Sequence, residues 1–157
     1  MNLADIKVDD IVDSSSGLCV SLWFGYCDIR CKGCHNKDLW DLYNYVENDI
    51  VVDKLLEAIP NHVLHNLSIL GGEPLASYGS NREDCLYIIQ KIREKYPKGT
   101  IKIYLWTGYV KEDIEKDPIV QEIFKNIDYL IDGPYIEELR TTSEPLIGST
   151  NQRINIM

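Results

Sequence analysis

Short apolar runs alternate with amphipathic runs along most of the chain. Apolar runs rich in β-branched or aromatic residues favour strands, and we predict them at Leu18–Phe24, Leu67–Leu70, Ile101–Trp106 and Ile127–Ile131. Runs with apolar residues at helical spacing favour helices, and we predict them at Asp49–Ala58, Arg82–Tyr96 and Lys111–Asn126, with a break at Pro118. This alternation is typical of an α/β fold with a mostly parallel sheet and right-handed crossovers.

The length of the chain limits how far such a sheet can close. With 157 residues the chain has the size of about one domain. We find no linker, internal repeat or low-complexity tract, and we therefore predict a single domain over residues 1–157. A closed eight-stranded α/β barrel takes about 250 residues, so the parallel sheet is expected to be partial or open.

Charge and hydropathy exclude two classes of partner. The formal net charge is −9, and nucleic-acid binding depends mostly on neutralisation of phosphates by Lys and Arg, so we expect no nucleic-acid partner. No stretch approaches the ~18–20 continuous apolar residues of a membrane span, so we expect a soluble protein with no membrane partner. The five cysteines are an odd number, and three of them lie within eight residues. This pattern is typical of a metal site in a reducing compartment, and we predict a cytoplasmic protein.

The three clustered cysteines form a CxxxCxxC array directly after the first predicted strand: Cys27, Cys31 and Cys34. An iron–sulfur cube needs four ligands, usually four thiolates. Three thiolates therefore indicate a [4Fe–4S] cluster with one iron left open, and an open coordination site is where a metal centre performs chemistry. The alternative is a zinc site completed by His35, which is less favoured because His35 directly adjoins Cys34 and the pair cannot easily span two tetrahedral corners.

The remaining cysteines and histidines carry no predicted chemistry. Cys19 and Cys85 lie in a predicted strand and a predicted helix, and free cysteine is among the most buried residue types, so we expect both in the core. His62 and His65 precede the second predicted strand in a polar stretch, and we expect both at the surface.

The motifs with unusual residues all follow predicted strands. The cysteine loop follows the first strand, and the next three strands are followed by Gly71–Pro74, Thr107–Tyr109 and Asp132–Tyr135. Functional groups of parallel sheets gather beyond the carboxyl ends of the strands. We therefore expect these four segments to build one site.

Together these motifs resemble the radical S-adenosylmethionine (SAM) superfamily and, within it, the activating proteins of anaerobic ribonucleoside-triphosphate reductase. The similar segments occur in the order of that family: Cys27–Asn36, Gly71–Pro74, Leu105–Tyr109, Asp132–Tyr135 and Gly148–Arg153. The resemblance covers about residues 10–154. It implies a partial, open radical SAM-type βα barrel.

The resemblance also implies an activity, two cofactors and two protein partners. A [4Fe–4S] cluster held by Cys27, Cys31 and Cys34 would cleave SAM reductively, and the resulting 5′-deoxyadenosyl radical would take a hydrogen from a glycine Cα. The product would be a glycyl radical on anaerobic ribonucleoside-triphosphate reductase. The electron would come from a flavodoxin or ferredoxin-type donor.

Further residues are implied to hold SAM or the substrate. The exposed carbonyls of Gly71 and Gly72, together with Glu73, would accept hydrogen bonds from the ammonium group of SAM, because glycine lets the backbone approach a ligand closely. The other implied cofactor-binding residues are Pro74, which stiffens the turn, Thr107, Gly108 and Asp132, which line the pocket, and Asn36, which positions the loop or the substrate peptide. Asn151 and Gln152 would grip a backbone at the substrate entrance.

The chain departs from the family pattern at Ile147, where an arginine is usual, and at Ser15–Gly17, where Gly-Pro-Gly is common. Three other interpretations stay open. They are an activase for a different glycyl-radical enzyme, a small-molecule radical SAM enzyme such as the deazaguanine-forming ring-contraction type, and a zinc- or cluster-binding adaptor without turnover.

Overall fold

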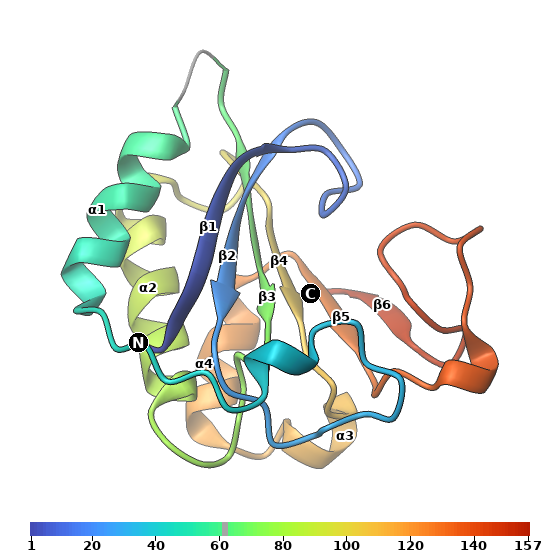
Figure 1. Cartoon of the computed structure of the whole chain (residues 1–157). Helices are drawn as coiled ribbons and strands as arrows, with labels where there is room; N and C mark the ends of the chain where they lie inside the picture. Colours follow the sequence, from blue (N-terminus) through green and yellow to red (C-terminus); the bar gives the residue numbers. More distant parts are fainter. Residues whose placement is uncertain (61–62) are drawn as a thin grey trace.

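A mixed β-sheet organises the chain. The computed structural model describes residues 1–60 and 63–157, and within them six strands lie side by side in chain order (Figure 1). They are β1 (Leu3–Asp10), β2 (Cys19–Phe24), β3 (Asn66–Gly71), β4 (Ile103–Trp106), β5 (Tyr129–Asp132) and β6 (Arg153–Ile156). The four central strands, β2 to β5, are parallel, whereas β1 and β6 pair antiparallel with β2 and β5. The sheet is open, with β1 and β6 at its two edges.

Helices cover one face of the sheet (Figure 1). They are α1 (Asn48–Ala58), α2 (Asn81–Lys95), the short α3 (Lys111–Ile114) and α4 (Pro118–Asn126), with 3₁₀ turns at Lys37–Leu39 and Glu137–Leu139. The strand side chains that face α1, α2 and α4 are fully buried and apolar, among them Leu22, Ile69 and Leu105. None of the helices described has the length and apolar character that a membrane span requires.

The predicted central strands and helices are confirmed to within a few residues. The predicted break at Pro118 separates α3 from α4, because the Asp117 carboxylate caps α4 by accepting the N–H groups of Ile119 and Val120 at 2.8 and 3.2 Å. The edge strands β1 and β6 were not predicted. Register irregularities interrupt the alternation of β1, and β6 has only four residues.

The structure confirms one expectation about buried residues and corrects another. Cys19 and Cys85 are fully buried in the core, as expected. His65 is also fully buried, so the prediction of a surface position was wrong. Its burial is possible because both ring nitrogens are paired: Nε2 lies 2.7 Å from Asp9 Oδ1 and Nδ1 lies 2.7 Å from the Val63 carbonyl. His62 lies outside the described residues.

The second face of the sheet is aromatic and is partly covered at the amino ends of the parallel strands. Tyr104 stacks on Tyr129 with ring centroids 4.7 Å apart. The connection between β1 and β2 folds onto this face, where Ser15 Oγ and Tyr104 Oη are hydrogen-bonded at 2.8 Å, and Ser68 donates to the Asp13 carbonyl. The carboxyl ends of the strands are thereby left as the place for a site.

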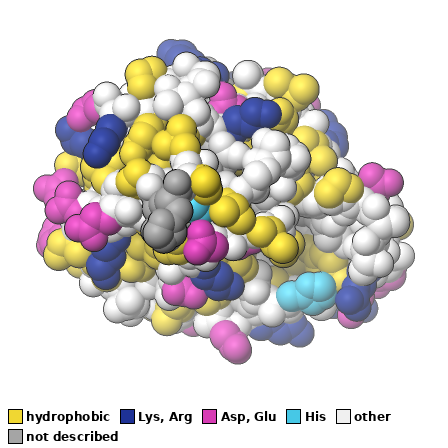
Figure 2. All heavy atoms as spheres, turned by 90° about the horizontal axis from the view of Figure 1, so that it is seen from above, with side chains coloured by type: hydrophobic (Ala, Val, Ile, Leu, Met, Phe, Trp, Pro, Cys, Tyr) yellow, Lys and Arg dark blue, Asp and Glu magenta, His cyan; other side chains and the backbone are white. Residues whose placement is uncertain are grey.

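The end of the molecule that carries the β1–β2 connection exposes apolar side chains (Figure 2). This connection and the segment before β3 each contribute two of them: Ile11, Val12, Val63 and Leu64.

Removing a buried side chain between sheet and helices is predicted to destabilise the fold. Ile89 on α2 is fully buried, so Ile89→Ala is expected to lower the free energy of unfolding by about 2–5 kcal/mol. Ile50 on α1 is 49% exposed, so Ile50→Ala should change it by less than about 1 kcal/mol. Urea denaturation of both variants measures the difference, and equal losses would contradict this description of the core.

Candidate functional site

A cavity of about 180 Å³ lies at the carboxyl ends of the parallel strands. Nine of the eleven predicted metal- and cofactor-binding residues line it: Cys27, Cys31, Cys34, Asn36, Gly71, Gly72, Glu73, Thr107 and Gly108. The loops after three successive strands thus meet at one place, as expected for a parallel sheet.

The cysteine loop is held by hydrogen bonds between its two arms. The Tyr26 N–H donates to the Leu39 carbonyl at 2.8 Å, and the Cys27 N–H donates to the Trp40 carbonyl at 3.1 Å. Within the loop, the Cys34 N–H donates to the Cys31 carbonyl at 3.1 Å, and Gly33 supplies the left-handed conformation of the turn with φ 76°. The loop therefore presents three thiols to one cavity.

Two of the three thiols, those of Cys27 and Cys31, are partly desolvated. Burial raises the pKa of Cys27 to about 11, although the backbone N–H groups of Ile29 and Arg30 oppose the shift. Burial also raises the pKa of Cys31. Metal ligation requires thiolates, so a cation in this cavity would have to displace these protons.

His35, the fourth ligand of the alternative zinc site, does not form a compact ligand set with the three thiols. Among the described residues, no three His, Cys, Asp or Glu side chains lie close enough to hold one metal ion. The exposed ring of His35 packs on Tyr135 instead, with centroids 5.3 Å apart. Three thiols spread around one cavity suit a [4Fe–4S] cube, in which each thiolate binds a different iron.

The two glycines at the end of β3 let the backbone pass very close to β2. A Cβ on Gly71 would lie 2.6 Å from the backbone of Phe24, and a Cβ on Gly72 would lie 2.2 Å from the Tyr26 carbonyl oxygen. The close approach is therefore to the end of β2, where the Gly72 and Glu73 N–H groups donate to the carbonyls of Phe24 and Tyr26. These glycines lock the turn after β3 onto the start of the cysteine loop.

Glu73 joins two strand ends. Its side chain is buried, and its carboxylate accepts hydrogen bonds from Thr107 Oγ1 at 2.8 Å and from the N–H groups of Gly108 and Leu75 at 2.7 and 2.9 Å. The predicted contact of this carboxylate with an ammonium group stays a prediction, because a carboxylate has about four acceptor sites and the three donors of the chain use three of them. Burial raises the pKa of Glu73 to about 7, against the effect of these donors. Pro74 follows it outside the lining of the cavity.

Asp132 was predicted to line the pocket, but it is absent from the lining of the cavity. Its fully buried carboxylate forms an ion pair with Arg153 and accepts hydrogen bonds from Asn155 Nδ2 at 2.9 Å and from the Lys111 N–H at 2.7 Å. Burial opposes ionisation, but the hydrogen bond from Arg153 keeps the pKa of Asp132 below its usual value. Arg153 also pairs with Glu112, so this cluster fastens β6 and α3 to β5.

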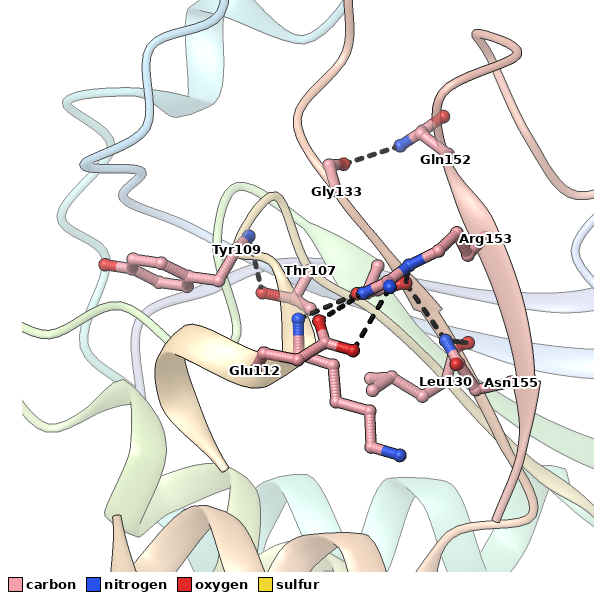
Figure 3. A network of polar contacts seen from close by, with 10 residues as sticks. Thr107, Tyr109, Glu112, Leu130, Gly133, Gln152, Arg153 and Asn155 are labelled. Carbon is pink, nitrogen blue, oxygen red and sulfur yellow. Dashed lines mark hydrogen bonds and ion pairs between the residues drawn. The ribbon is translucent and has the colours of Figure 1, made fainter. Parts of the chain in front are cut away.

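The side-chain amides of Asn151 and Gln152 form hydrogen bonds with backbone groups, but these groups belong to their own chain. Gln152 Nε2 donates to the Gly133 carbonyl at 3.0 Å (Figure 3), and Asn151 Nδ2 donates to the Pro134 carbonyl at 2.7 Å. Gln152 Oε1 accepts the Gly148 N–H at 2.8 Å. Through these contacts the segment after β5 becomes a wall of the cavity, to which Gly133, Tyr135 and Gln152 contribute.

Several residues of the site were missed at the sequence level. Trp40 and Trp106 line the cavity, and Asp28 braces the cysteine loop by accepting hydrogen bonds from Tyr109 Oη at 2.6 Å and from Ser77 Oγ at 2.9 Å. Tyr109 belongs to a segment already singled out, so its position after β4 was the signal that linked it to the loop. Asp28 likewise lies within the segment Cys27–Asn36, whereas Trp40 carried no comparable signal.

Comparisons with known proteins agree with this description. The family model described as "4Fe-4S single cluster domain" matches residues 14–155. An anaerobic ribonucleoside-triphosphate reductase-activating protein of Enterobacteria phage T4 is 32% identical over 98% of this chain and 93% of its own length. Proteins with the same name from Vibrio cholerae and Escherichia coli K12 are 29% and 27% identical, each over 99% of this chain and 97% and 98% of their own lengths.

The close approach at Gly72 yields a direct test. Gly72→Ala places a Cβ against the Tyr26 carbonyl, and such overpacking is expected to lower the free energy of unfolding of the metal-free protein by about 1–3 kcal/mol. In Gly108→Ala the new Cβ meets the side chain of Ile29 at 3.1 Å and not a backbone atom, so a smaller loss is expected in urea denaturation. If Gly108→Ala lowered the free energy of unfolding as much as Gly72→Ala, the proposed role of Gly72 in the close backbone contact would be refuted.

The hydrogen bond from Thr107 to Glu73 has a predicted pH signature. The folded-state pKa of Glu73 is about 7 against an ordinary value of 4.5, so its contribution to stability is full below pH 4.5 and falls as the pH rises through 7. Thr107→Val removes a donor that lowers this pKa. We expect a loss of about 1–3 kcal/mol, and a decline in stability that continues to higher pH than in the wild type.

Urea unfolding of the metal-free protein at a series of pH values measures this effect. Thr100→Val, at an exposed position, is the control and should reproduce the wild-type pH profile. A Thr107→Val profile parallel to that of the wild type would show that Thr107 does not influence Glu73.

Proposed function

Because the chain belongs to the family of anaerobic ribonucleoside-triphosphate reductase-activating proteins and contains its 4Fe-4S single cluster domain, we propose that it activates such a reductase. In this proposal it holds a [4Fe–4S] cluster and SAM and generates a glycyl radical on the reductase. The names of the relatives from phage T4, Vibrio cholerae and Escherichia coli support this target.

The observation that carries the proposal is the set of three thiols around one cavity. Cys27, Cys31 and Cys34 are the proposed cluster ligands, whereas Cys19 and Cys85 are buried in the core, away from the cavity. Three thiolates leave one iron of a cube without a protein ligand. The amino and carboxylate groups of SAM are the proposed ligands of that iron.

The bound cluster and SAM supply one-electron cleavage chemistry, which ends in removal of a hydrogen atom from a glycine Cα. The chain itself orients the ligands and excludes water. The carbonyls of Gly71 and Gly72 are proposed to accept hydrogen bonds from the SAM ammonium group, and Thr107, Gly108 and Asn36 to position the rest of SAM or the substrate peptide.

The walls of the cavity support radical chemistry by their composition. Ile29, Leu70, Trp40 and Trp106 contribute apolar surface, which keeps water away from reactive species. Glu73 keeps its hydrogen bonds with Thr107 and Gly108, and these bonds maintain the shape of the cavity. No proton transfer by a side chain is needed in this proposal.

The open sheet supports a protein substrate. We propose that the parallel strands β2–β5 form a partial radical SAM-type βα barrel, and that the side left open admits a protruding loop of the reductase. A flavodoxin or ferredoxin-type protein is the proposed electron donor. The formal net charge of −9 argues against a nucleic-acid partner, and the single domain is proposed to work in the cytoplasm.

Generation of the radical tests the proposed function. The reconstituted protein is mixed anaerobically with the reductase, SAM and dithionite, and the doublet of a glycyl radical is expected by electron paramagnetic resonance. Release of 5′-deoxyadenosine without that doublet would argue for a different substrate. A protein that takes up zinc and no iron–sulfur cluster would overturn the proposal.

Substitution of the cysteines tests the ligand assignment. Cys27→Ala, Cys31→Ala and Cys34→Ala are each expected to abolish the cluster absorbance and the cleavage of SAM, because each removes one of only three thiolates. Cys19→Ala and Cys85→Ala are the controls and should keep both properties. Retained SAM cleavage in any of the first three variants would remove that cysteine from the ligand set.

A further inference from the structure

One indole at the cavity has a hydrogen-bond donor without an acceptor. Trp40 lines the cavity, and its Nε1 is buried with no hydrogen-bond partner among the described residues. An indole N–H can only donate, and a buried donor without an acceptor carries a free-energy penalty. An acceptor supplied by the occupant of the cavity would remove that penalty.

A second indole at the same cavity behaves differently. Trp106 also lines the cavity, but its Nε1 donates to the Leu146 carbonyl at 2.8 Å. Other polar groups of the lining are paired as well, including Glu73, Thr107 and Gln152. Trp40 therefore differs from Trp106, Glu73 and Gln152, whose polar groups at the same cavity have partners within the chain.

The position of Trp40 indicates which acceptor it meets. Its carbonyl accepts the Cys27 N–H at 3.1 Å, so the residue lies directly beside the first of the three proposed ligands. The Arg30 guanidinium and the Lys37 ammonium lie 5.8 and 6.0 Å from the centre of its ring. These cations favour a defined ring plane, and Trp40 lines the same cavity as Cys27.

We infer that Trp40 Nε1 donates a hydrogen bond to a sulfur atom of the [4Fe–4S] cluster and thereby raises its reduction potential. This inference rests on the proposed function, which supplies the cluster. Hydrogen bonds to the sulfurs are among the factors that set the potential of a cluster. A donor stabilises the reduced form more than the oxidised form, because the reduced cluster carries one more negative charge.

The potential of the reconstituted protein, measured without SAM by redox titration, tests the inference. Trp40→Phe keeps an aromatic ring and removes the donor, so its cluster is expected to have a more negative potential than the wild type. Trp106→Phe makes the same change to an indole that already has an acceptor, and it is the matched control with a smaller shift. An unchanged potential in Trp40→Phe, or equal shifts in both variants, would overturn the inference, even if Trp40→Phe binds SAM more weakly.

A measurement on the unmutated residue covers the case in which Trp40→Phe fails to hold a cluster. Wild-type protein labelled with ¹⁵N in the tryptophan indoles is reduced, and electron spin-echo envelope modulation should detect a ¹⁵N coupled to the cluster. The coupling should persist in Trp23→Phe and Trp106→Phe, which leave Trp40 as one of two indoles in each case. Its absence from wild type, or its loss in Trp106→Phe, would overturn the inference.

These measurements separate the inference from the proposed function. A wild type that forms no [4Fe–4S] cluster would remove the proposed function itself. A wild type that forms the cluster and generates the glycyl radical, but shows no effect of Trp40 on the potential and no ¹⁵N coupling, would leave the function intact and remove only the role of Trp40.

Discussion

The backbone of the turn after β3 passes so close to the end of β2 that one added carbon atom at Gly72 would lie 2.2 Å from the Tyr26 carbonyl oxygen. This contact fixes the position of the backbone at the start of the cysteine loop, because Cys27 directly follows Tyr26. The same turn carries Glu73, which reaches across to Thr107 and Gly108 after β4. The ends of β2, β3 and β4 are thus joined by one continuous set of backbone and carboxylate contacts, and the cavity is the space that they enclose.

Two buried carboxylates connect different strands around this cavity. Glu73 connects β3 to β4, and Asp132 connects β5 to β6 and α3 through Arg153, Asn155 and the Lys111 N–H. The groups proposed to bind ligands are accordingly thiols, backbone carbonyls and aromatic side chains. That division suits radical chemistry, which needs ligands held in place and water kept out more than it needs acids and bases.

The central elements could be predicted because their residues obey a simple period. β2 to β5 and α1, α2 and α4 are each buried on a face that the alternation of apolar residues makes visible. β1 and β6 were not predicted, because these edge strands are largely exposed and are short or irregular, so their apolar pattern is weak. The residues correctly predicted to line the cavity come from motifs at strand ends. The hydrogen-bond partners of Glu73 and Asp132 could not be predicted in this way, because a motif does not say which donors surround a carboxylate. His65 shows the same limit: its partner Asp9 is 56 residues away in sequence.

The reversed edge strands bear on how such an architecture can be enlarged. A further strand–helix unit joins a parallel sheet by pairing with its outermost parallel strand. Here the outermost parallel strands are β2 and β5, and their outer sides already pair with β1 and β6. Grafting another unit would displace one of these edge strands, and at β6 it would also break the Arg153 cluster. Protein engineers who want to extend this scaffold should therefore insert new segments into the surface connections, where the hydrogen-bonded order of strands stays undisturbed.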